Sequence, residues 1–263
     1  MSIRVNKLIA ASGLCSRRQA DQYIQNGWIR LIDAPTQALH PGLQVPSDTK
    51  WEFLPAAWRD IQQKVSLILH KPVGYVSSQP NPSAKPSIQL LTNENEWKSM
   101  KSKPQQPQQR KAPRNLTNLA VAGRLDLNSS GLLLFTQQGA LAKAVIGPNS
   151  QVEKEYLVRV RDPSSEMLHF DQIQERIHSL RQGIKDRGDF LEAVSVEVLN
   201  EHQIQFVLHA GKHHHLRRMC AAVGWHVEAL KRVRIGTCLL GGLPLGKWRY
   251  LSDEELAAFL SPS

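Results

Sequence analysis

Val121-Ala-Gly-Arg-Leu-Asp-Leu-Asn-Ser-Ser-Gly-Leu-Leu-Leu-Phe-Thr136 places one carboxylate, Asp126, in a short polar turn between two apolar segments. The turn residues from Asn128 to Gly131 tolerate tight backbone conformations and bond to their own backbone. The apolar run from Leu132 to Phe135 is short enough to be a buried strand. A charge at the rim of such a strand is costly unless something compensates it, which favours a functional role for Asp126. The alternative is an ordinary aspartate that caps its own turn.

This stretch and four others resemble segments of the RNA pseudouridine synthases of the RsuA type. Gly-Arg-Leu-Asp, two residues, Ser, one residue and Gly-Leu-Leu-Leu is similar to the signature of that family. The other similar segments follow in family order over nearly the whole chain: His70-Lys-Pro-Val-Gly-Tyr-Val-Ser77, Val152-Glu-Lys-Glu-Tyr-Leu-Val158, Gly211 to Arg234, and Leu243-Pro-Leu-Gly-Lys-Trp-Arg249. The resemblance implies an enzyme that isomerises uridine to pseudouridine, with Asp126 as its catalytic residue.

The composition is that of a globular protein with a polyanionic partner. The 263 residues, 41% of them hydrophobic, can form one sizeable core and a small appended module. The net charge of +10 favours nucleic acid as the partner. Cys15, Cys220 and Cys238 have no metal-type spacing, which fits a reducing cytosol. No apolar run is long enough to span a membrane, and the apolar stretch before Cys15 is not typical of an export signal, so we expect a cytoplasmic protein.

Residues 1–58 are predicted to form a small RNA-binding domain. Ser16 and Gln19 form a capping box that opens a helix. Arg17 and Arg18 lie in its first turn, where positive charge opposes the helix macrodipole, and phosphate contact is the obvious use for them. The segment resembles the S4-like domain shared with a ribosomal small-subunit protein, which binds structured RNA. The alternative is a solvated basic face on a helical hairpin.

Residues 59–263 are predicted to form the catalytic domain, with Pro55 to Gln63 as the linker. The order of helical and alternating segments indicates an α+β fold with adjacent antiparallel strands. The resemblance implies the pseudouridine synthase fold, a central mixed, mainly antiparallel β-sheet with flanking helices and a cleft. Residues 79–118 are rich in Pro, Gln and Lys, so we expect a flexible basic insertion. It is either an electrostatic tether for RNA or a solvated loop without function.

The expected reaction breaks the bond from ribose C1′ to base N1 and rejoins C1′ to base C5. No atoms are lost, so neither a redox cofactor nor a metal is required. The carboxylate of Asp126 must be ionised and shielded from water, whether it attacks the sugar, adds to the base or removes a proton. A nearby guanidinium would keep it ionised. The resemblance assigns this guanidinium to Arg217, because Arg218 would point elsewhere on a helix.

The resemblance also implies contacts to the substrate. Tyr156 is expected to stack on the target base and Leu230 to close the pocket on it, and for both the alternative is plain core packing. Arg124, in the signature segment, is placed with them. Further basic residues are expected to contact RNA together with Arg17 and Arg18, and these are Lys71, Lys212, Arg218, Lys231 and Arg232. For Lys71 the alternative is a solvated loop lysine.

One segment departs from the family pattern. Lys212-His-His-His215 replaces the usual Arg-x-Arg-Gln. Neighbouring residues on a helix point about 100° apart, so three consecutive histidines cannot converge on one ion. We therefore expect RNA contacts that respond to pH at His213 to His215, and no metal site.

The predicted function is site-specific pseudouridine formation in ribosomal RNA. The Glu-Lys-Glu-Tyr strand, the Met219-Cys220 pair and the closing segment most resemble the family branch that modifies large-subunit (23S) RNA and sometimes a tRNA. The alternatives are action on small-subunit RNA or tRNA, and a catalytically silent ribosome-assembly factor that keeps the fold. Hydrolysis by paired carboxylates is weakly supported, because no second acid accompanies Asp126. We expect a monomer whose partner is structured RNA: ribosomal RNA, a tRNA or an assembly intermediate.

Overall fold

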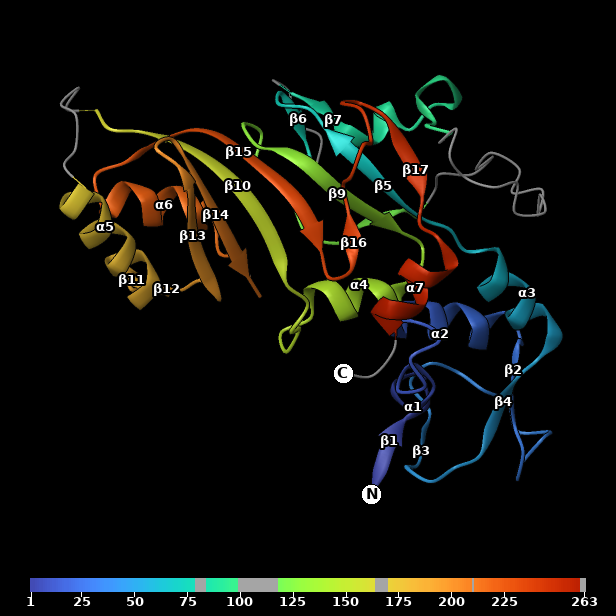
Figure 1. The fold of residues 1–263 in the computed structure, drawn as a ribbon. Helices are drawn as coiled ribbons and strands as arrows, with labels where there is room; N and C mark the ends of the chain where they lie inside the picture. Colours follow the sequence, from blue (N-terminus) through green and yellow to red (C-terminus); the bar gives the residue numbers. More distant parts are fainter. Residues whose placement is uncertain (79–83, 99–117, 164–169, 210, 261–263) are drawn as a thin grey trace.

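The computed structural model describes residues 1–78, 84–98, 118–163, 170–209 and 211–260. A large unit built on a twisted sheet carries a smaller N-terminal unit at its lower right (Figure 1). In the part of the chain that the structure describes, no helix is long and apolar enough to cross a membrane.

The large unit is organised around a nine-stranded sheet. Its strands are β5 Ser66–Lys71, β8 Ala120–Val121, β9 Ser130–Thr136, β10 Lys154–Arg161, β13 Ser195–Asn200, β14 Gln203–Leu208, β15 His226–Ile235, β16 Cys238–Leu239 and β17 Trp248–Tyr250. Their order is β13-β14-β10-β15-β9-β5-β17, with β8 beside β9 and β16 beside β15. The pair β9–β15 is parallel, whereas β9 and β5 are antiparallel. The predicted mixed, mainly antiparallel sheet is thus confirmed.

Strand β9 is the apolar run of the signature segment, and it is buried on both faces of the sheet. Leu133 and Phe135 point into one hydrophobic cluster, and Leu132 and Leu134 into another. This follows from the alternation of side chains along a strand. Because both faces are covered, the run is apolar throughout instead of alternating with polar residues.

Four helices cover the two faces of the sheet. They are α4 Gly139–Ile146, α5 Phe170–Gln182, α6 His215–Ala222 and α7 Asp253–Leu260. Helices α5 and α6 contribute Ile177, Leu180 and Met219 to the cluster that contains Leu133. Helices α4 and α7 pack on the opposite cluster, which contains Leu132. Residues 164–169, which precede α5, lie outside the described part of the chain.

The N-terminal unit has a separate hydrophobic core. Its elements are β1 Ser2–Arg4, α1 Val5–Ala10, α2 Arg17–Gln25, β2 Ile29–Leu31, β3 Gln44–Pro46, β4 Trp51–Phe53 and α3 Pro55–Gln63. Strand β1 pairs with β3, and β2 pairs with β4. The predicted capping box is confirmed, because Ser16 and Gln19 each bond to the other's backbone at the start of α2.

The segment predicted as a linker, Pro55–Gln63, is instead the helix α3. Proline at its start suits the first turn, where no backbone N–H donor is needed. Ala57 is fully buried in the N-terminal core, and the Tyr23 hydroxyl donates to Asp60 at 2.7 Å. The chain therefore remains helical and packed across the predicted boundary after residue 58.

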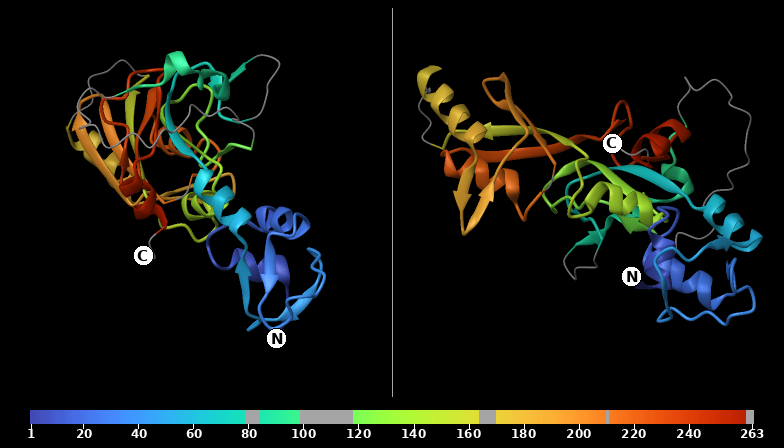
Figure 2. Two further views of the ribbon diagram at one scale, coloured as in Figure 1. Left: turned by 90° about the vertical axis from the view of Figure 1, so that its right-hand side faces the viewer. Right: turned by 90° about the horizontal axis from the view of Figure 1, so that it is seen from below.

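The two units touch at the start of α2. The Gln19 side-chain amide donates to the Gln137 carbonyl at 2.7 Å. Gly139 lies so close to Ser16 that an added Cβ would be 2.2 Å from the serine Cβ. The N-terminal unit thus sits beside α4, as the two turned views also show (Figure 2).

Part of the predicted flexible insertion is ordered structure. Strand β7 Lys85–Pro86 pairs in parallel with β6 Tyr75–Val76, and two 3₁₀ turns follow at η1 Ser87–Leu90 and η2 Asn93–Asn95. The Trp97 backbone N–H then donates to the Trp248 carbonyl at 2.7 Å, which ties the segment to β17. The prediction is wrong for residues 84–98. Residues 79–83 and 99–117 lie outside the described part of the chain.

Candidate active site

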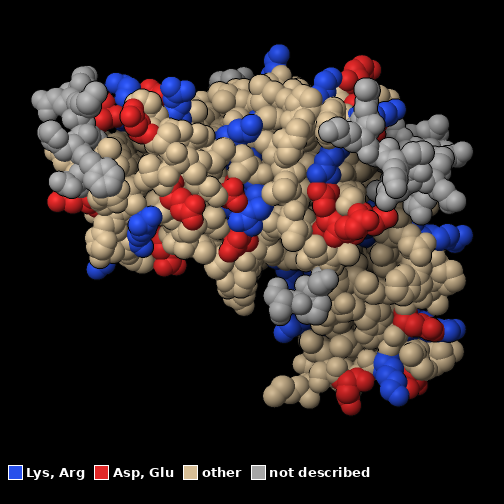
Figure 3. Space-filling model, in the orientation of Figure 1, with Lys and Arg blue, Asp and Glu red and all other residues tan. Residues whose placement is uncertain are grey.

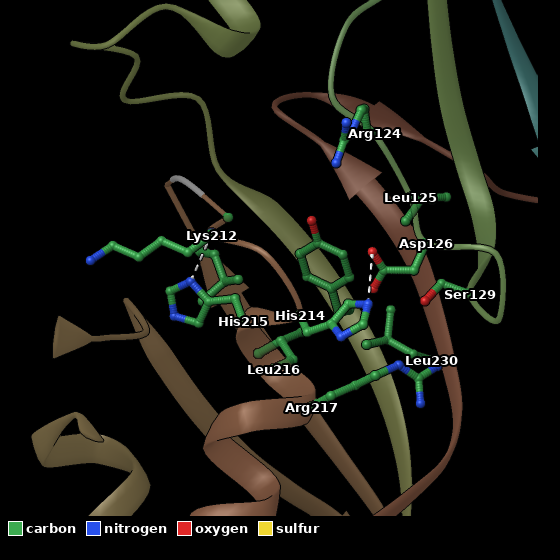
Figure 4. Close-up of a pocket in the computed structure, with 13 residues that line it drawn as sticks. Arg124, Leu125, Asp126, Ser129, Lys212, His214, His215, Leu216, Arg217 and Leu230 are labelled. Carbon is green, nitrogen blue, oxygen red and sulfur yellow. Dashed lines mark hydrogen bonds and ion pairs between the residues drawn. The ribbon is translucent and has the colours of Figure 1, made fainter. Parts of the chain in front are cut away.

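Asp126 lines a pocket of about 80 Å³ between the signature turn and the start of α6 (Figure 4). The residues around it are Arg124, Leu125, Asp126, Ser129, Tyr156, Leu208, Gly211, Lys212, His214, His215, Leu216, Arg217 and Leu230. They come from the turn before β9, from strands β10, β14 and β15, and from α6 and the loop that precedes it. Eight residues that the sequence singled out are thereby brought together: Arg124, Asp126, Tyr156, Lys212, His214, His215, Arg217 and Leu230.

Backbone hydrogen bonds hold the Asp126 turn in place. The Ser77 hydroxyl donates to the Leu125 carbonyl at 2.6 Å and accepts from the Leu125 N–H at 2.8 Å. The Gly74 N–H donates to the Leu127 carbonyl at 2.9 Å. The segment from Gly74 to Ser77 therefore clamps both neighbours of Asp126. The carboxylate itself stays one-third exposed, at 33%.

Tyr156 and Leu230 form apolar walls of the pocket. Tyr156 is 9% exposed and Leu230 is 6% exposed, and both also belong to a hydrophobic cluster. They lie on the paired strands β10 and β15, where Leu230 faces Val158. Each side chain packs in the core and also lines the pocket, so its core packing leaves the predicted contact with the base open.

Arg232 is an interior residue, so its predicted contact with RNA is wrong. Its side chain is 1% exposed. The guanidinium donates to the Leu132 carbonyl and to the Gly123 carbonyl, both at 2.8 Å. It also lies 5.9 Å from the centre of the Tyr156 ring. A buried guanidinium needs such acceptors, and here it fastens the signature turn to β9 and β15.

Lys71 is also buried, which contradicts both alternatives drawn from the sequence. Its side chain is fully inaccessible, and its ammonium donates to the carbonyls of Pro72 and Tyr75, each at 2.8 Å. Burial lowers the pKa of Lys71 to about 8, against the opposing charge of Asp126. The lysine therefore lies behind the turn as a positive charge that faces the carboxylate from inside.

We expect the free energy of unfolding of the wild type to rise at alkaline pH as Lys71 loses its proton, and we expect Lys71→Met to lack this rise. The pKa of Lys71 is about 8 in the folded protein and 10.5 in its ordinary state. Below about pH 8 the lysine is charged in both states, so its burial opposes folding fully. Between these two values the unfolded chain binds more protons, and the free energy of unfolding rises with pH by up to about 3 kcal/mol.

Urea unfolding of both proteins at about pH 7.5 and about pH 10 measures this gain. The wild type should gain stability relative to the variant across that interval. Burial also lowers the pKa of Lys154 to about 8, but Lys154 is present in both proteins and cancels. Parallel pH dependences of the two proteins would contradict the account.

Arg217 lines the pocket, but it does not pair with Asp126 as predicted. Its guanidinium donates to the Asn128 carbonyl at 2.8 Å and to the Val227 carbonyl at 3.3 Å. Figure 4 shows the side chain running beneath Leu230 and away from the carboxylate. The guanidinium of Arg217 is therefore hydrogen-bonded to backbone carbonyls, one in the turn and one in β15, and it joins these two elements.

His214 faces the carboxylate instead, whereas the sequence predicted an RNA contact for this histidine. Its Nε2 lies 3.9 Å from Asp126 Oδ1 (Figure 4). The residue precedes α6 in the left-handed conformation, with φ 51°, and its ring stacks on His213 at 3.9 Å between centres. Only the last residue of the His-His-His run is helical, so the helical argument against a metal site does not hold. Among the described residues, no three His, Cys, Asp or Glu side chains are grouped to hold a metal ion.

Arg218 is bound by two carboxylates, so its predicted role as a free RNA contact is wrong. It pairs with Asp186 and Asp189 on the hairpin of β11 Ile184–Asp186 and β12 Asp189–Leu191. Its side chain is only 13% exposed. Lys212 pairs with Asp189 as well, at 3.0 Å, but remains 45% exposed.

The other predicted RNA contacts lie outside the pocket. Lys231 is half-buried on β15. Arg17 and Arg18 are exposed at the start of α2, as the capping pattern implied. They border two grooves where the N-terminal unit meets α4, of about 1040 Å³ on the Arg17 side and about 730 Å³ on the Arg18 side.

The chain is similar to proteins of known family. Residues 65–222 match the family described as RNA pseudouridylate synthase. The chain is 29% identical to the dual-specificity RNA pseudouridine synthase RluF of Escherichia coli strain K12, over 97% of this chain and 77% of that protein. It is 27% identical to the ribosomal small subunit pseudouridine synthase A of Vibrio cholerae, over 97% of this chain and 99% of that protein.

A solved structure agrees with these sequence matches. The crystal structure of a pseudouridylate synthase superposes with a TM-score of 0.61 at 23% identity, over 98% of this chain and 99% of the other, which shows a common fold. The family match covers the strand with Lys71, the Asp126 turn, Tyr156 and α6. The chain therefore belongs to the RNA pseudouridine synthase family, and within it to the RsuA and RluF type of isomerase that forms pseudouridine in RNA.

Proposed function

We propose that Asp126 is the catalytic residue and that the substrate is a uridine in the large-subunit (23S) ribosomal RNA. The observation that carries the first part is the geometry of the pocket. Asp126 is the carboxylate among its lining residues, between the apolar walls made by Tyr156 and Leu230. The similarity to RluF over nearly the whole chain supports the RNA target, together with the large-subunit features of the sequence.

The pocket suits a base that has left the RNA stack. Unstacking a uridine costs roughly a few kcal/mol, which contacts to the protein must offset. The flat ring of Tyr156 provides a stacking surface, and Leu230 excludes water from the other side. Asp126 is one-third exposed without RNA, so a bound base would cover the remaining surface of the carboxylate.

The reaction rearranges the nucleoside without loss of atoms. The bond from C1′ to N1 breaks, the base turns, and a bond from C1′ to C5 forms. The proton on C5 leaves and N1 gains one. Asp126 serves this sequence as its carboxylate, and Lys71 and Arg232 add positive charge behind the turn. Arg217 and Ser77 hold the turn so that the carboxylate points into the pocket.

We further propose that the N-terminal unit is an S4-like RNA-binding domain. Arg17 and Arg18 are exposed, and Lys7 and Lys143 line the same groove as Arg17. By contrast, among the described residues on the face in Figure 3, basic side chains are scattered and acidic ones gather over α7. Phosphate contacts at the junction would position RNA relative to the catalytic pocket without reading its sequence.

The double variant Arg17→Gln, Arg18→Gln is expected to weaken RNA binding about tenfold at low salt and to reduce its salt dependence by about two released ions. Binding is measured by filter retention at several salt concentrations. Arg30→Gln is the matched control, because Arg30 is an exposed arginine of the same unit that pairs with Glu52. Equal salt slopes for the double variant and the wild type would refute the proposed contacts.

The target is tested by chemical mapping of pseudouridine in total RNA from cells with and without the gene. A site in 23S RNA should disappear in the deletion strain and return with the wild-type gene but not with Asp126→Asn. Loss of a site in 16S RNA or tRNA would overturn the large-subunit assignment. If no site changes, the catalytic proposal fails and a silent assembly factor takes its place.

A further inference from the structure

His214 is the titratable side chain placed against Asp126 in this structure. Its Nε2 is 3.9 Å from Asp126 Oδ1, a distance at which a protonated ring makes an ion pair. The arginine expected in this role, Arg217, is bound to the carbonyls of Asn128 and Val227. The ring is 48% exposed, so it exchanges protons freely with solvent.

The backbone holds this ring in a conformation that few residues adopt. His214 has φ 51° and ψ 30°, which is unfavourable for a residue with a Cβ by about 1 kcal/mol. Stacking on His213, with 20° between the ring planes, supports the orientation. The His214 carbonyl also accepts the Arg218 N–H of α6 at 2.9 Å, which anchors the residue to the helix. Strain of this kind persists where the surrounding structure fixes a residue, and it concentrates at functional sites.

The other charged groups and histidines around the pair are basic. Facing it from the loop and α6 are Lys212, His213, His215 and Arg217, from the turn Arg124, and from behind the turn Lys71 and Arg232. Lys212 is paired with Asp189, and burial lowers the pKa of His215. Among the described residues that line the pocket, Asp126 is the acidic one. The carboxylate is therefore the anion available to a protonated His214.

We propose that His214 is a positioning residue that, in its protonated form, orients the Asp126 carboxylate in the pocket. This rests on the proposed catalytic role of Asp126. An imidazole loses its charge near neutral pH, whereas an arginine does not. The support is therefore present at low pH and is lost as the pH rises through the titration of the ring. This chain thus makes the charge beside its catalytic carboxylate depend on pH.

The first test is the pH profile of the single-turnover rate and of RNA affinity, from about pH 6 to about pH 8.5, which spans the histidine range. The substrate is protein-free ribosomal RNA from the deletion strain. In the wild type the rate attributable to His214 should fall as the ring loses its proton. His214→Asn should be about tenfold slower at the low end, with RNA affinity unchanged. His214→Arg should keep its rate until Lys71, with a pKa of about 8, loses its charge.

His202→Asn is the matched control. It removes an exposed histidine in the turn between β13 and β14 that does not line the pocket, and it leaves the ion-pair partner of Asp126 in place. It should keep the wild-type pH profile of the rate. If His214→Asn has that same profile, or if it weakens RNA binding without slowing the reaction, His214 is an RNA contact and the inference is wrong.

The second test does not require activity. NMR of the histidine rings follows the proton on His214 in wild type and in Asp126→Asn, both without RNA. The His214 ring signals at low pH should differ between the two proteins, because the ring lies against a charged carboxylate in the wild type alone. Identical His214 signals would refute the pairing even if the enzyme is active. Conversely, full activity of Asp126→Asn would refute the proposed function and leave this comparison of ring signals intact.

Discussion

Asp126→Asn is expected to lower the single-turnover rate of pseudouridine formation by about a thousandfold or more, equivalent to at least about 4 kcal/mol of transition-state stabilisation. The amide has the size of the carboxylate but neither its negative charge nor its basicity. RNA affinity should be kept or slightly increased, because the change removes an anion from a site that binds a polyanion. The rate is measured with enzyme in excess, by mass spectrometry of the digested RNA.

A second carboxylate close to the pocket provides the control. Asp189 pairs with Lys212 and Arg218 on the neighbouring hairpin but does not line the pocket. Asp189→Asn should stay within a few-fold of the wild-type rate, since it perturbs surface ion pairs worth about 1 kcal/mol or less. If Asp126→Asn stays within tenfold of the wild type, or if both variants are equally slow, Asp126 is not the catalytic residue.

Gly131→Ala is expected to destabilise the fold by more than about 4 kcal/mol, or to prevent folding. Gly131 has φ +110°, and an added Cβ would lie 2.2 Å from the Arg232 carbonyl oxygen and 2.5 Å from the Arg232 nitrogen. These are backbone atoms of β15, where it runs parallel to β9, so no flexible side chain can move aside. The loss should appear in urea unfolding or as insoluble protein.

Gly242→Ala separates this steric conflict from the general effect of adding a methyl group. No heavy atom lies within 4 Å of the Cβ position at Gly242, and its φ lies outside the left-handed region. We expect this variant within about 0.5 kcal/mol of the wild type, as for most surface changes. A Gly131→Ala protein as stable as Gly242→Ala would show that β9 and β15 do not approach each other as closely as described.

The close approach at Gly131 also explains why the signature segment sets the geometry of the site. It lets Arg232 reach across β9 to the carbonyls of Leu132 and Gly123. The small residue, the buried cation and the Asp126 turn thus form one structural feature. A substitution at Gly131 that still folds should slow the reaction as well, because it displaces the turn.

The sequence alone determined features that depend on neighbouring residues. The run Leu132 to Phe135 predicted β9, and the Ser16–Gln19 box predicted the start of α2. Each of these signals is complete within a few residues, since side-chain periodicity and capping are local effects. The order of such segments indicated an α+β fold with adjacent antiparallel strands, and the resemblance to the family implied the mixed sheet.

Only the tertiary structure decided which charges serve the site. Lys71 and Arg232 were expected to contact RNA and are buried. Arg217 was expected to pair with Asp126, but His214 lies against that carboxylate and Arg217 donates to the Asn128 carbonyl. The acceptor that fixes Arg232, the Leu132 carbonyl, is 100 residues away in the sequence. A cationic side chain is buried only where carbonyls or carboxylates accept its hydrogen bonds, because its burial is too costly without these acceptors. Those acceptors come from distant strands and turns, so local pattern does not reveal which charges surround Asp126.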